Sequence, residues 1–600
     1  MKLNDHRCDV LVIGGGLAGM QAALEASRLG ARVIIASEQK VGRSGNSVIA
    51  EGGYAAPFGH VDPRDNPETF YEDILRSGQF LNDRALARAL AEESCRAVEE
   101  LRRAGVPFRM EGERYAQKHY PGHTYPRNCY LVREGGSHIT SPLLGHLRGR
   151  SIRLLPHCYA LRLLVAGNEC CGALFSGTRS DALFVVGAQA TILACGGAAA
   201  IYRHSTNVRG AAGDGYALAL EAGAALRDME FVQFYPTIML GPVRNFLMDF
   251  SCFGRRAPLL NRLGERFLER YAPDTLESCT RDVKSRAIFT EVRDGMGVNG
   301  GVIMDISALP REELETYTPR FCRVFARRGL DPHRERIVVA PAAHFFMGGV
   351  VIDERCGTGV PGLFACGEVT GGVHGANRLA DNALSECQVF GRTAGEHGAR
   401  YALGRALKYE TSPDWDPPMR RSARLPPSPR WMARLREIMW EKVGIERDRD
   451  GLEEAISELG RLREEVGDSL AAGTGHELYR VTKVRNAVAT GLMVTRAALA
   501  RRESRGAHFR RDFPDQDSGF SRSIMVERDG KGGLKARLSA GWRGRCGCWG
   551  ISLRRPGRAA PRLHFSEDFL PCPRSASRRR RARSRGGRSS GFRGHSAPRA

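Results

Sequence analysis

The sequence predicts an α/β protein whose Rossmann-like dinucleotide-binding domain is built from two separate parts of the chain. Three observations support this fold class. A strand, a glycine turn and a helix follow one another near the N-terminus, two strands far along the chain also end in glycines, and the apolar pattern changes between them. An inserted α+β domain, a C-terminal helical domain and a disordered basic tail complete the predicted architecture.

The N-terminal motif runs from Cys8 to Glu38 as CDVLVIGGGLAGMQAALEASRLGARVIIASE. Its apolar runs predict strands at Val10–Ile13 and Val33–Ile35, and the stretch Met20–Leu29 predicts the helix between them. A glycine-rich turn indicates a nucleotide site when it follows a strand and opens a helix, and this one meets both conditions.

Gly14, Gly16 and Gly19 supply the G-x-G-x-x-G spacing of that turn. Glycines let the backbone approach a pyrophosphate at the helix N-terminus, where unpaired N–H groups favour an anion. The second strand leads into Ser37 and Glu38, whose side chains can bond a ribose hydroxyl. The sequence therefore predicts a dinucleotide site here, rather than a tight turn without a ligand.

Two further glycine clusters follow apolar strands, at Ala190–Tyr202 and at Val360–Glu386, and Asp214 lies between glycines in GAAGDGYALALEAGA. A nicotinamide cofactor would need only the first glycine turn, whereas a large flavin needs a more extensive binding site formed by several segments. Glycine-lined strand ends spread over more than half of the chain therefore predict one flavin site assembled from distant segments.

The domain boundaries follow from changes of pattern along the chain. RDVKSRAIFTEV predicts a helix and GGVIMDIS a strand within the inserted domain, and helical spacing predominates from about Pro429 to Arg505. The predicted domains are residues 1–236 and 341–405 for the two dinucleotide-binding parts, 237–340 for the insertion, 406–537 for the helical domain and 538–600 for the tail.

The composition is that of a soluble globular protein, with 600 residues, 42% hydrophobic and 26% charged. No apolar run is long enough to span a bilayer and the N-terminus lacks the pattern of a secretory signal, so we expect a cytoplasmic location with at most peripheral membrane contact. The 16 cysteines form no C-x-x-C pair, which argues against a zinc or iron–sulfur site within the chain; no metal is predicted.

The net charge of +23 is concentrated at the C-terminus. Residues 538–600 hold 16 arginines and no lysine against Glu567 and Asp568, so they carry more than half of the excess. The run RSASRRRRARSRGGRSSG has almost no apolar periodicity and predicts disorder. Two interpretations remain: a solvated or non-native terminus, which makes a nucleic-acid partner unlikely, or a tail that binds RNA or membrane.

The motifs together resemble one family. In order they are GGGLAGMQAAL, RSGNSVIAEGG, LACGG, GAAGDGYALALEAGA, MEFVQFYPT, TRDVKSRAI, APAAHFFMGGV, FACGEVTGGVHGANRLADNALSE and ESRGAHFRRDFP. Across roughly residues 8 to 535 the sequence is similar to the flavoprotein subunit of succinate dehydrogenase and fumarate reductase, a family that includes L-aspartate oxidase. The resemblance implies a two-part FAD-binding domain, a capping domain formed by the insertion, and a helical domain.

The resemblance also interprets the loop RSGNSVIAEGGYAAP. In the family this loop lies along the flavin, and respiratory succinate dehydrogenases carry a histidine there that bonds covalently to it. Asn46 occupies that position and cannot form the bond, so FAD is expected to be held non-covalently. Without the tether, we expect the enzyme to favour reduction of its substrate. The loop residues implied as cofactor-binding are Ser44, Asn46, Ser47, Gly52 and Gly53.

Further site residues are implied by their match to family motifs. Arg281 is the expected proton donor, with Asp282 orienting it, and His344 and Arg378 are expected to grip one substrate carboxylate. Glu368 is expected to bond the FAD ribose. The remaining residues implied as cofactor-binding are Ala194, Gly196, Gly197, Asp214, Asn382, Ala383 and Leu384, the last three through backbone N–H groups at the flavin's pyrimidine edge.

The sequence departs from the family at the far end of the expected substrate pocket. Tyr235 stands where fumarate reductases have a histidine, so we include it among the catalytic candidates although it carries no positive charge. Asp249 and Phe250 stand where the family has Thr-Glu. Arg255 and Arg256 would restore positive charge if they point inward, with solvent exposure as the alternative. We therefore expect altered selectivity for a second carboxylate, and a substrate other than fumarate or succinate.

The predicted function is that of an FAD-dependent oxidoreductase acting on the CH–CH or C=C bond next to a carboxylate. Two alternatives remain: an amino-acid oxidase like L-aspartate oxidase, and a catalytically silent flavoprotein subunit whose tail binds RNA or lipid. The expected partners are a small carboxylic acid and an electron-transfer partner. The latter is a thiol-linked protein, a soluble donor or an iron–sulfur subunit.

Overall fold

The computed structural model describes most of the chain up to the predicted tail. The described residues are 4–51, 53–133, 135–241, 243, 246–248, 251–405, 428–467, 474–529 and 533–539. Of the predicted tail, this includes only Leu538 and Ser539, so the predicted disorder lies outside the described residues. None of the helices in these ranges has the length and apolar character needed to cross a membrane.

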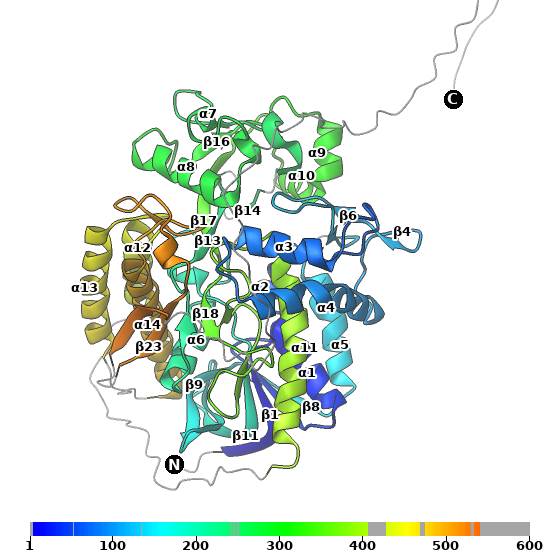
Figure 1. Cartoon of the computed structure of the whole chain (residues 1–600), viewed down its shortest axis with the longest axis vertical. Coiled ribbons are helices and arrows are strands. Elements are labelled where there is room, and N and C mark those ends of the chain that lie inside the picture. The colour runs from blue at the N-terminus through cyan, green and yellow to red at the C-terminus, as the bar shows by residue number, and fades with distance from the viewer. Residues whose placement is uncertain are drawn as a thin grey trace, which may run out of the picture. The chain divides into compact units, whose positions relative to one another are not determined.

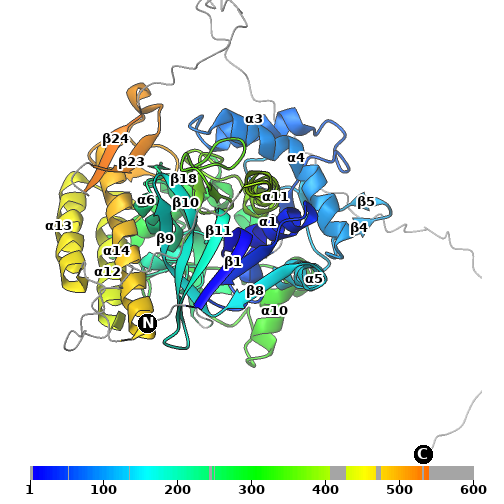
Figure 2. The same ribbon diagram turned by 90° about the horizontal axis from the view of Figure 1, so that it is seen from below.

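The first sheet is the scaffold of the dinucleotide-binding part (Figures 1 and 2). Its strand order is β8 (Ile152–Pro156), β2 (Val33–Ser37), β1 (Asn4–Ile13), β11 (Leu183–Leu193), β10 (Glu169–Gly177) and β9 (Cys158–Ala166), with β19 (Leu363–Ala365) also pairing with β11. The pairs β8–β2, β2–β1, β1–β11 and β11–β19 are parallel, whereas β10 pairs antiparallel with β11 and β9. The ends of β1 and β11, where two of the predicted glycine turns begin, therefore lie side by side.

Two helices from distant parts of the chain cover one face of this sheet, α1 (Leu17–Arg28) and α11 (Asn382–Ala402) (Figure 2). A Cβ added at Gly395 in α11 would lie 2.3 Å from the Ala22 carbonyl oxygen in α1, so only glycine allows this approach. The predicted strand–helix–strand order is confirmed, with α1 beginning three residues earlier than the apolar pattern indicated. A further helix, α5 (Ser137–Arg148), packs beside α1.

Two paired strands, and not a linker, connect the insertion to the dinucleotide-binding part. β13 (Val232–Gly241) and β17 (Val338–Phe346) pair antiparallel, and both predicted boundaries of the insertion fall inside them. Their sheet has the order β14 (Phe246–Leu247), β13, β17, β16 (Val302–Met304) and β15 (Leu259–Leu260). The other elements are η2 (Ser251–Arg256), α7 (Leu268–Tyr271), η3 (Leu276–Ser278), α8 (Arg281–Arg293), α9 (Arg311–Tyr317) and α10 (Pro319–Ala326).

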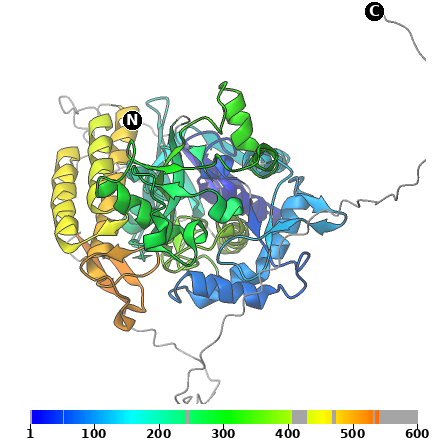
Figure 3. The same ribbon diagram turned by 90° about the horizontal axis from the view of Figure 1, so that it is seen from above.

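The insertion has a hydrophobic core of its own, which includes Phe267, Ile288, Phe321 and Phe325. Figure 1 shows this segment, in green, above the dinucleotide-binding part, and Figure 3 views the protein from that side. Because β13 and β17 run without a break from one core into the other, residues on these two strands are fixed at the junction. Tyr235 and His344 are such residues.

The C-terminal part begins with the helices α12 (Ser428–Lys442), α13 (Arg449–Val466) and α14 (Gly475–Ala500). Their apolar residues join the main core, and α14 packs against β9 and β10. After Arg505 the described residues form no α-helix. Here β23 (Ile524–Arg528) and β24 (Leu534–Leu538) extend a sheet with the order β20 (Thr370–Gly371), β18 (Gly349–Val351), β12 (Leu226–Arg227), β23 and β24.

A buried ionic cluster fastens the C-terminal part to the strand region before β13. The fully buried guanidinium of Arg501 donates to Glu230 at 2.5 Å and to Glu503 at 2.8 Å, and it lies 3.5 Å from Asp228. Removing one member of such a buried network leaves an uncompensated charge and costs about 3–5 kcal/mol. The cluster therefore fixes α14 relative to the dinucleotide-binding part.

The remaining described elements are short or lie around the sheets. They are α2 (Asn46–Ile49), β3 (Tyr54–Ala55), α3 (Pro67–Ser77), α4 (Arg84–Arg103), β4 (Met110–Glu111), β5 (Arg114–Tyr115), β6 (Gln117–Lys118), β7 (Asn128–Cys129), η1 (Ala199–Ile201), α6 (Asp214–Glu221), β21 (Glu446–Arg447), β22 (Phe509–Arg510) and η4 (Ser518–Phe520).

Candidate active site

The first glycine turn joins the end of β1 to the start of α1 with no room for side chains. A Cβ at Gly14 would lie 2.1 Å from the Ala194 carbonyl oxygen, and Gly14 has a φ of +124°. A Cβ at Gly19 would lie 2.0 Å from the Gly14 carbonyl oxygen, while Gly16 is the residue that precedes the first turn of α1. The turn thus allows an anion to approach the start of α1 closely.

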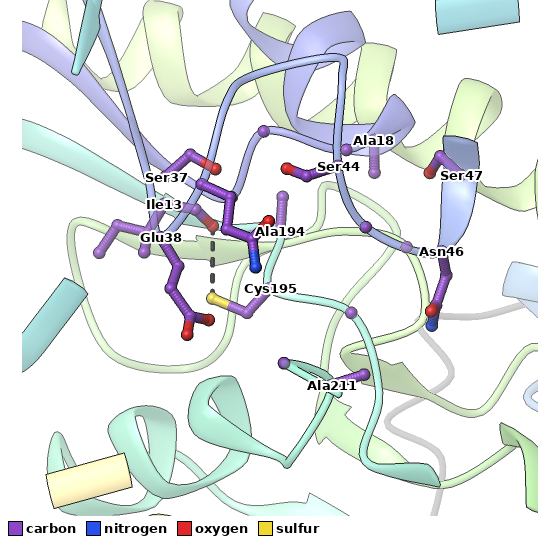
Figure 4. Close-up of a pocket in the computed structure, with 18 of the residues that line it drawn as sticks. Ile13, Ala18, Ser37, Glu38, Ser44, Asn46, Ser47, Ala194, Cys195 and Ala211 are labelled. Carbon is purple, nitrogen blue, oxygen red and sulfur yellow. Dashed lines mark hydrogen bonds between the residues drawn. The ribbon is translucent and has the colours of Figure 1, made fainter. Parts of the chain in front are cut away.

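A cavity of about 400 Å³ begins at this turn (Figure 4). The predicted residues that line it are Gly14, Gly16, Ser37, Glu38, Ser44, Asn46, Ser47, Ala194, Gly196, Asp214 and Glu368. Figure 4 shows Glu38 and Asn46 at opposite ends, with Ala194 and Cys195 between them. The cavity is therefore elongated, as a bound dinucleotide requires.

Side chains of α14 hold the carboxylates at the Glu38 end of this cavity. Tyr479 donates to one carboxylate oxygen of Glu38 at 2.8 Å, and Lys483 donates to the other at 2.8 Å. Lys483 also donates to Asp214 at 3.0 Å, and Tyr159 donates to Asp214 at 2.5 Å. Two predicted cofactor-binding carboxylates are thus held by one lysine from the C-terminal helices.

At the other end, Asn46 links the glycine-rich loop to the substrate side. Its amide nitrogen donates to Asn207 at 2.7 Å, and its amide oxygen accepts from the Val208 N–H at 3.1 Å. Asn207 in turn donates to the His344 carbonyl oxygen at 2.8 Å. Ser47 accepts from the Leu17 N–H at 3.1 Å, which holds the loop over the start of α1.

A second cavity of about 390 Å³ adjoins the first, since Asn46, Ser47, Glu368 and Cys387 line both. The predicted residues lining the second cavity are Asn46, Ser47, Gly53, Tyr235, Arg281, His344, Glu368, Arg378, Ala383 and Leu384. All four catalytic candidates thus face one space, which continues the elongated first cavity.

Two of the catalytic candidates, Arg281 and His344, lie beside the ring of Tyr235. The guanidinium carbon of Arg281 lies 4.9 Å from the centroid of that ring, and the ring of His344 lies 5.4 Å from it, centroid to centroid. Arg378 is buried and donates to the Gln233 side chain at 3.0 Å. Thr206 Oγ1 lies 2.8 Å from His344 Nδ1 and orients the imidazole.

The electrostatics of the second cavity favour a bound anion. Desolvation and the charges of Arg378 and Arg281 hold the pKa of His344 well below its usual value, so the imidazole is neutral at pH 7. Burial and the charge of Arg281 lower the pKa of Arg378 to about 10. Burial raises the pKa of Glu368 to about 7, although the hydrogen bond that it accepts from the Phe346 N–H acts in the opposite direction and lowers the pKa. Arg378 thus remains a cation at neutral pH.

The arginines of the second cavity have no carboxylate partner within the described ranges. Neither Arg281 nor Arg378 lies within ion-pair distance of a described carboxylate, and the buried Nε of Arg378 has no hydrogen-bond partner there. Buried guanidinium groups are normally paired. Their open N–H groups therefore mark a place for a ligand carboxylate.

Several predicted residues do not line either cavity. Gly19 and Gly197 lie behind the wall: a Cβ at Gly197 would meet the Glu368 carboxylate at 2.3 Å, so this glycine makes room for that side chain. Asn382 begins α11 and has two buried amide atoms without a partner in the described structure. Gly52 lies outside the described residues.

The expected arrangement around Arg281 and the far end of the pocket needs correction. Asp282 shares no hydrogen bond or ion pair with Arg281 in the described chain; the face of Tyr235 supports Arg281 instead. Arg255 donates to the Asp274 carbonyl oxygen and Arg256 pairs with Glu313 at 2.7 Å, so neither points into the cavities. Both arginines are exposed, and their bonds to other residues of the insertion direct their side chains away from the cavities. Asp249 and Phe250 lie outside the described residues.

Sequence reasoning missed several residues at the site. Arg320, Phe246 and Leu247 of the insertion line the second cavity, and Lys483 holds the first. No local motif marks any of them, because tertiary packing and not a local pattern brings each of them to the site. No described group of three or more His, Cys, Asp or Glu side chains is placed to hold a metal ion.

These features fit FAD. The side-chain-free turn at Gly14 suits a pyrophosphate, the two adjoining cavities suit a long ligand with a large ring, and the start of α11 places Ala383 and Leu384 at the ring end. The cationic cluster lies at that same end. Fold and site therefore define the class of flavoprotein oxidoreductases, with a cavity lined by arginines beside the site that fits the cofactor.

Known proteins agree with this class. Residues 9–384 match the family described as FAD binding domain, and residues 432–538 match that described as fumarate reductase flavoprotein C-term. The chain is 40% identical over 540 residues to one subunit of the fumarate reductase (CoM/CoB) of Methanothermobacter marburgensis, covering 88% of this chain and 98% of that protein. It is 38% identical over 519 residues to the L-aspartate oxidase of Halobacterium salinarum, covering 84% and 96%.

Among solved structures, FrdA of the Escherichia coli quinol fumarate reductase aligns with a TM-score of 0.82 at 28% identity, covering 90% of this chain and 97% of that chain. The chain belongs to the succinate dehydrogenase/fumarate reductase flavoprotein family. It is an FAD-dependent oxidoreductase acting on CH–CH bonds, which confirms the family and the class of reaction predicted from the sequence.

Proposed function

We propose that the protein reduces the C=C bond of an unsaturated carboxylic acid, with Arg281 as proton donor and with His344 and Arg378 holding the carboxylate. The observation that carries this proposal is the position of both guanidinium groups on one cavity without a carboxylate partner in the described chain. A substrate carboxylate would supply the missing counter-charge.

Arg378 and His344 serve as the grip. Gln233 engages one nitrogen of the Arg378 guanidinium and leaves the others, including the buried Nε, for the substrate. A carboxylate bound at Nε2 of His344 selects the tautomer protonated there, and Thr206 then donates to Nδ1. Fixed donors of this kind stabilise the negative charge that develops on the carboxylate as the double bond is reduced.

When bound and reduced by two electrons from the electron-transfer partner, FAD would supply the hydride that one carbon of the double bond accepts. Arg281 donates the proton to the other carbon. No described residue accepts a hydrogen bond from its guanidinium, so its N–H groups are available to a ligand in the cavity. Arginine is a weak acid, and its transfer of a proton relies on a dry site in which the Tyr235 ring and the Arg378 cation face it.

The proposal includes a separate electron-transfer partner. The name of the relative from Methanothermobacter marburgensis identifies it as one subunit of a larger enzyme, and the present sequence contains no C-x-x-C pair. We therefore propose that an iron–sulfur subunit supplies the electrons, with a cytoplasmic location and any membrane contact made through that partner.

The test is anaerobic titration of the dithionite-reduced holoenzyme with fumarate, crotonate and their saturated counterparts. Reoxidation of the flavin spectrum by the unsaturated acids alone, lost in Arg378→Ala, is the expected result. A spectrum that no unsaturated acid changes would overturn the proposal. The 38% identity to an L-aspartate oxidase favours amino-acid oxidation as a second function, and hydrogen peroxide formed with L-aspartate in air would identify it.

A further inference from the structure

Helix α8 carries the proposed proton donor at its start and is bound at its end by the C-terminal part of the chain. Arg281 is the first residue of this helix. Near the other end, the Thr290 hydroxyl donates to Oε1 of Glu446 at 2.7 Å, and Arg293 donates to Oε2 of the same carboxylate. Glu446 lies on β21, and its side chain is 7% exposed. One nearly buried carboxylate therefore holds two side chains of α8.

The strand that carries Glu446 is itself firmly anchored. Glu446 pairs with Phe509 where β21 and β22 lie side by side. The next residue, Arg447, is fully buried and donates to the Glu230 carbonyl oxygen at 2.8 Å. The side chain of Glu230 in turn accepts from Arg501 of the buried ionic cluster. Glu446 thus has a fixed position relative to the dinucleotide-binding part.

The length of α8 makes the position of Arg281 sensitive to the other end of the helix. Ser285 donates to the Phe234 carbonyl oxygen at 3.1 Å, so the first half of α8 rests on β13. At 1.5 Å per residue, the contacts with Glu446 lie roughly 14–18 Å from the start of the helix. A tilt about the β13 contact moves the two ends of the helix in opposite directions. A displacement of about 1 Å at a reacting group can lower a rate about 100-fold.

The residues proposed to grip the substrate carboxylate are held independently of α8. His344 lies on β17, where Thr206 Oγ1 is 2.8 Å from its Nδ1. Arg378 precedes α11 and donates to Gln233 at 3.0 Å. A change at the end of α8 should therefore affect proton delivery without weakening the carboxylate grip.

We propose that Glu446 is a positioning residue for the proton step. By binding Thr290 and Arg293 it fixes the end of α8, and this holds Arg281 at the start of the helix in place to protonate the substrate carbon. The inference rests on the proposed function for the role of Arg281. It makes the C-terminal part a contributor to the reaction, although Glu446 does not line the second cavity.

The first test measures proton transfer and substrate binding separately. Dithionite-reduced holoenzyme is mixed in a stopped-flow instrument with fumarate or crotonate, whichever reoxidises the wild-type flavin faster, and the dependence on acid concentration gives the limiting rate and the Kd. Glu446→Ala is expected to lower the limiting rate about 10-fold or more and to leave the Kd within about threefold. The ratio of the rates in H2O and D2O should be larger than in wild type, because the proton step then limits the rate.

Two further variants at acidic positions complete this comparison. Glu446→Gln keeps an acceptor oxygen for Thr290 and is expected to recover part of the rate. Glu441→Ala is the matched control: Glu441 is an exposed carboxyl on α12 that pairs with Arg203 at 3.1 Å and not with α8. It is expected to show the wild-type rate, Kd and isotope effect.

Hydrogen exchange followed by mass spectrometry tests the contact without turnover. In Glu446→Ala, peptides from residues 281–293 are expected to exchange faster than in wild type and in Glu441→Ala, whereas peptides from residues 449–466 should be unchanged. Thr290→Val removes one of the two bonds at nearly constant volume and keeps the neighbouring Phe289 ring, which lies 6.1 Å from the Trp440 ring. It should change the rate and the exchange in the same direction but less, and it decides the question if Glu446→Ala does not fold.

An unchanged limiting rate in Glu446→Ala and Thr290→Val would overturn the proposal. A fall in rate matched by an equal rise in Kd would also overturn it, because the substitution would then disturb the whole site. Failure of the proposed function is distinct. In that case neither acid would reoxidise the wild-type flavin, while the exchange comparison would still decide whether Glu446 holds α8.

Discussion

The guanidinium of Arg281 lies over the ring of Tyr235, 4.9 Å from its centroid, at the junction of the insertion and the dinucleotide-binding part. Arg281 begins α8 and Tyr235 lies on β13, so the contact joins a helix of the insertion to a strand of its sheet. A cation–π contact of this kind contributes about 0.5–2 kcal/mol. The aromatic face thus holds Arg281 in place and leaves its N–H groups available to the cavity.

Arg281→Lys should lower kcat about 100-fold or more, within the range attributed to a positioned general acid. Lysine keeps the charge but has neither the planar face that stacks on Tyr235 nor the spread of N–H donors. Steady-state reduction of fumarate by the holoenzyme measures the effect. Arg286→Lys, on the same helix but packed against Phe509 instead of the cavity, is the control and should retain wild-type kcat. Equal rates for the two variants would remove Arg281 from the proton step.

The FAD-free protein should lose stability between pH 5 and pH 8 because of Glu368. Burial raises the pKa of this carboxyl from 4.5 to about 7 in the folded protein. The native state therefore binds the proton more tightly, and the resulting stabilisation is complete below the unfolded value and is lost as the pH rises through about 7. The contribution is at most about 3 kcal/mol.

Urea titrations at the two pH values measure this change in the free energy of unfolding. In Glu368→Gln, most of the change in the free energy of unfolding between pH 5 and pH 8 should be absent. Glu354 is an exposed carboxyl in the turn after β18, so Glu354→Gln should keep the wild-type pH dependence. Identical pH profiles for all three proteins would show that Glu368 is already ionised at pH 5.

Lys483→Met should weaken FAD binding about 10- to 100-fold, as expected for the loss of charge-assisted hydrogen bonds. Without the ammonium group, the carboxylates of Glu38 and Asp214 repel each other at the nucleotide end of the first cavity. Although burial opposes the charge, Asp214 and Glu38 raise the pKa of Lys483 above its usual value of 10.5. Its contribution to stability is therefore constant at neutral pH and is lost only as the pH rises through that raised value.

Fluorescence titration of FAD-free protein with FAD gives the dissociation constants for this comparison. Arg485→Met is the control on the same helix, because Arg485 pairs with Glu221 and does not line the first cavity. A Lys483→Met protein that binds FAD as tightly as the Arg485→Met protein would show that the lysine has no part in the site.

Denaturation should release all of the FAD from the polypeptide. Asn46 has no nucleophilic ring nitrogen, and both ends of its amide are engaged, with Asn207 and with the Val208 N–H. The denatured holoenzyme is run on a gel and, in parallel, passed through a filter that retains the polypeptide. Flavin fluorescence is then measured in the protein band and in the filtrate. Flavin that migrates with the chain would demonstrate a covalent bond at another residue.

Local sterics and periodicity made the dinucleotide-binding part predictable. The alternation of apolar runs with the spacing of Gly14, Gly16 and Gly19 implies strand, turn and helix because only glycine fits where a Cβ would meet a carbonyl oxygen at 2.1 Å. The motif series also placed Arg281, His344 and Arg378, and the structure brings all three to one cavity. Each lies in a stretch whose own residues carry the signal.

Only the tertiary structure decided which distant side chains complete the site. Lys483 meets Glu38 across 445 positions of sequence, and Arg320 reaches the second cavity because Phe321 and Phe325 anchor α10 in the core of the insertion. The same packing leaves Arg255 and Arg256 with partners outside the cavity. A side chain's direction depends on the packing of whole elements, which no local pattern encodes. The sequence by itself therefore determined the cofactor class and the candidate residues Arg281, His344 and Arg378, and the fold determined that they share one cavity and which cations surround them.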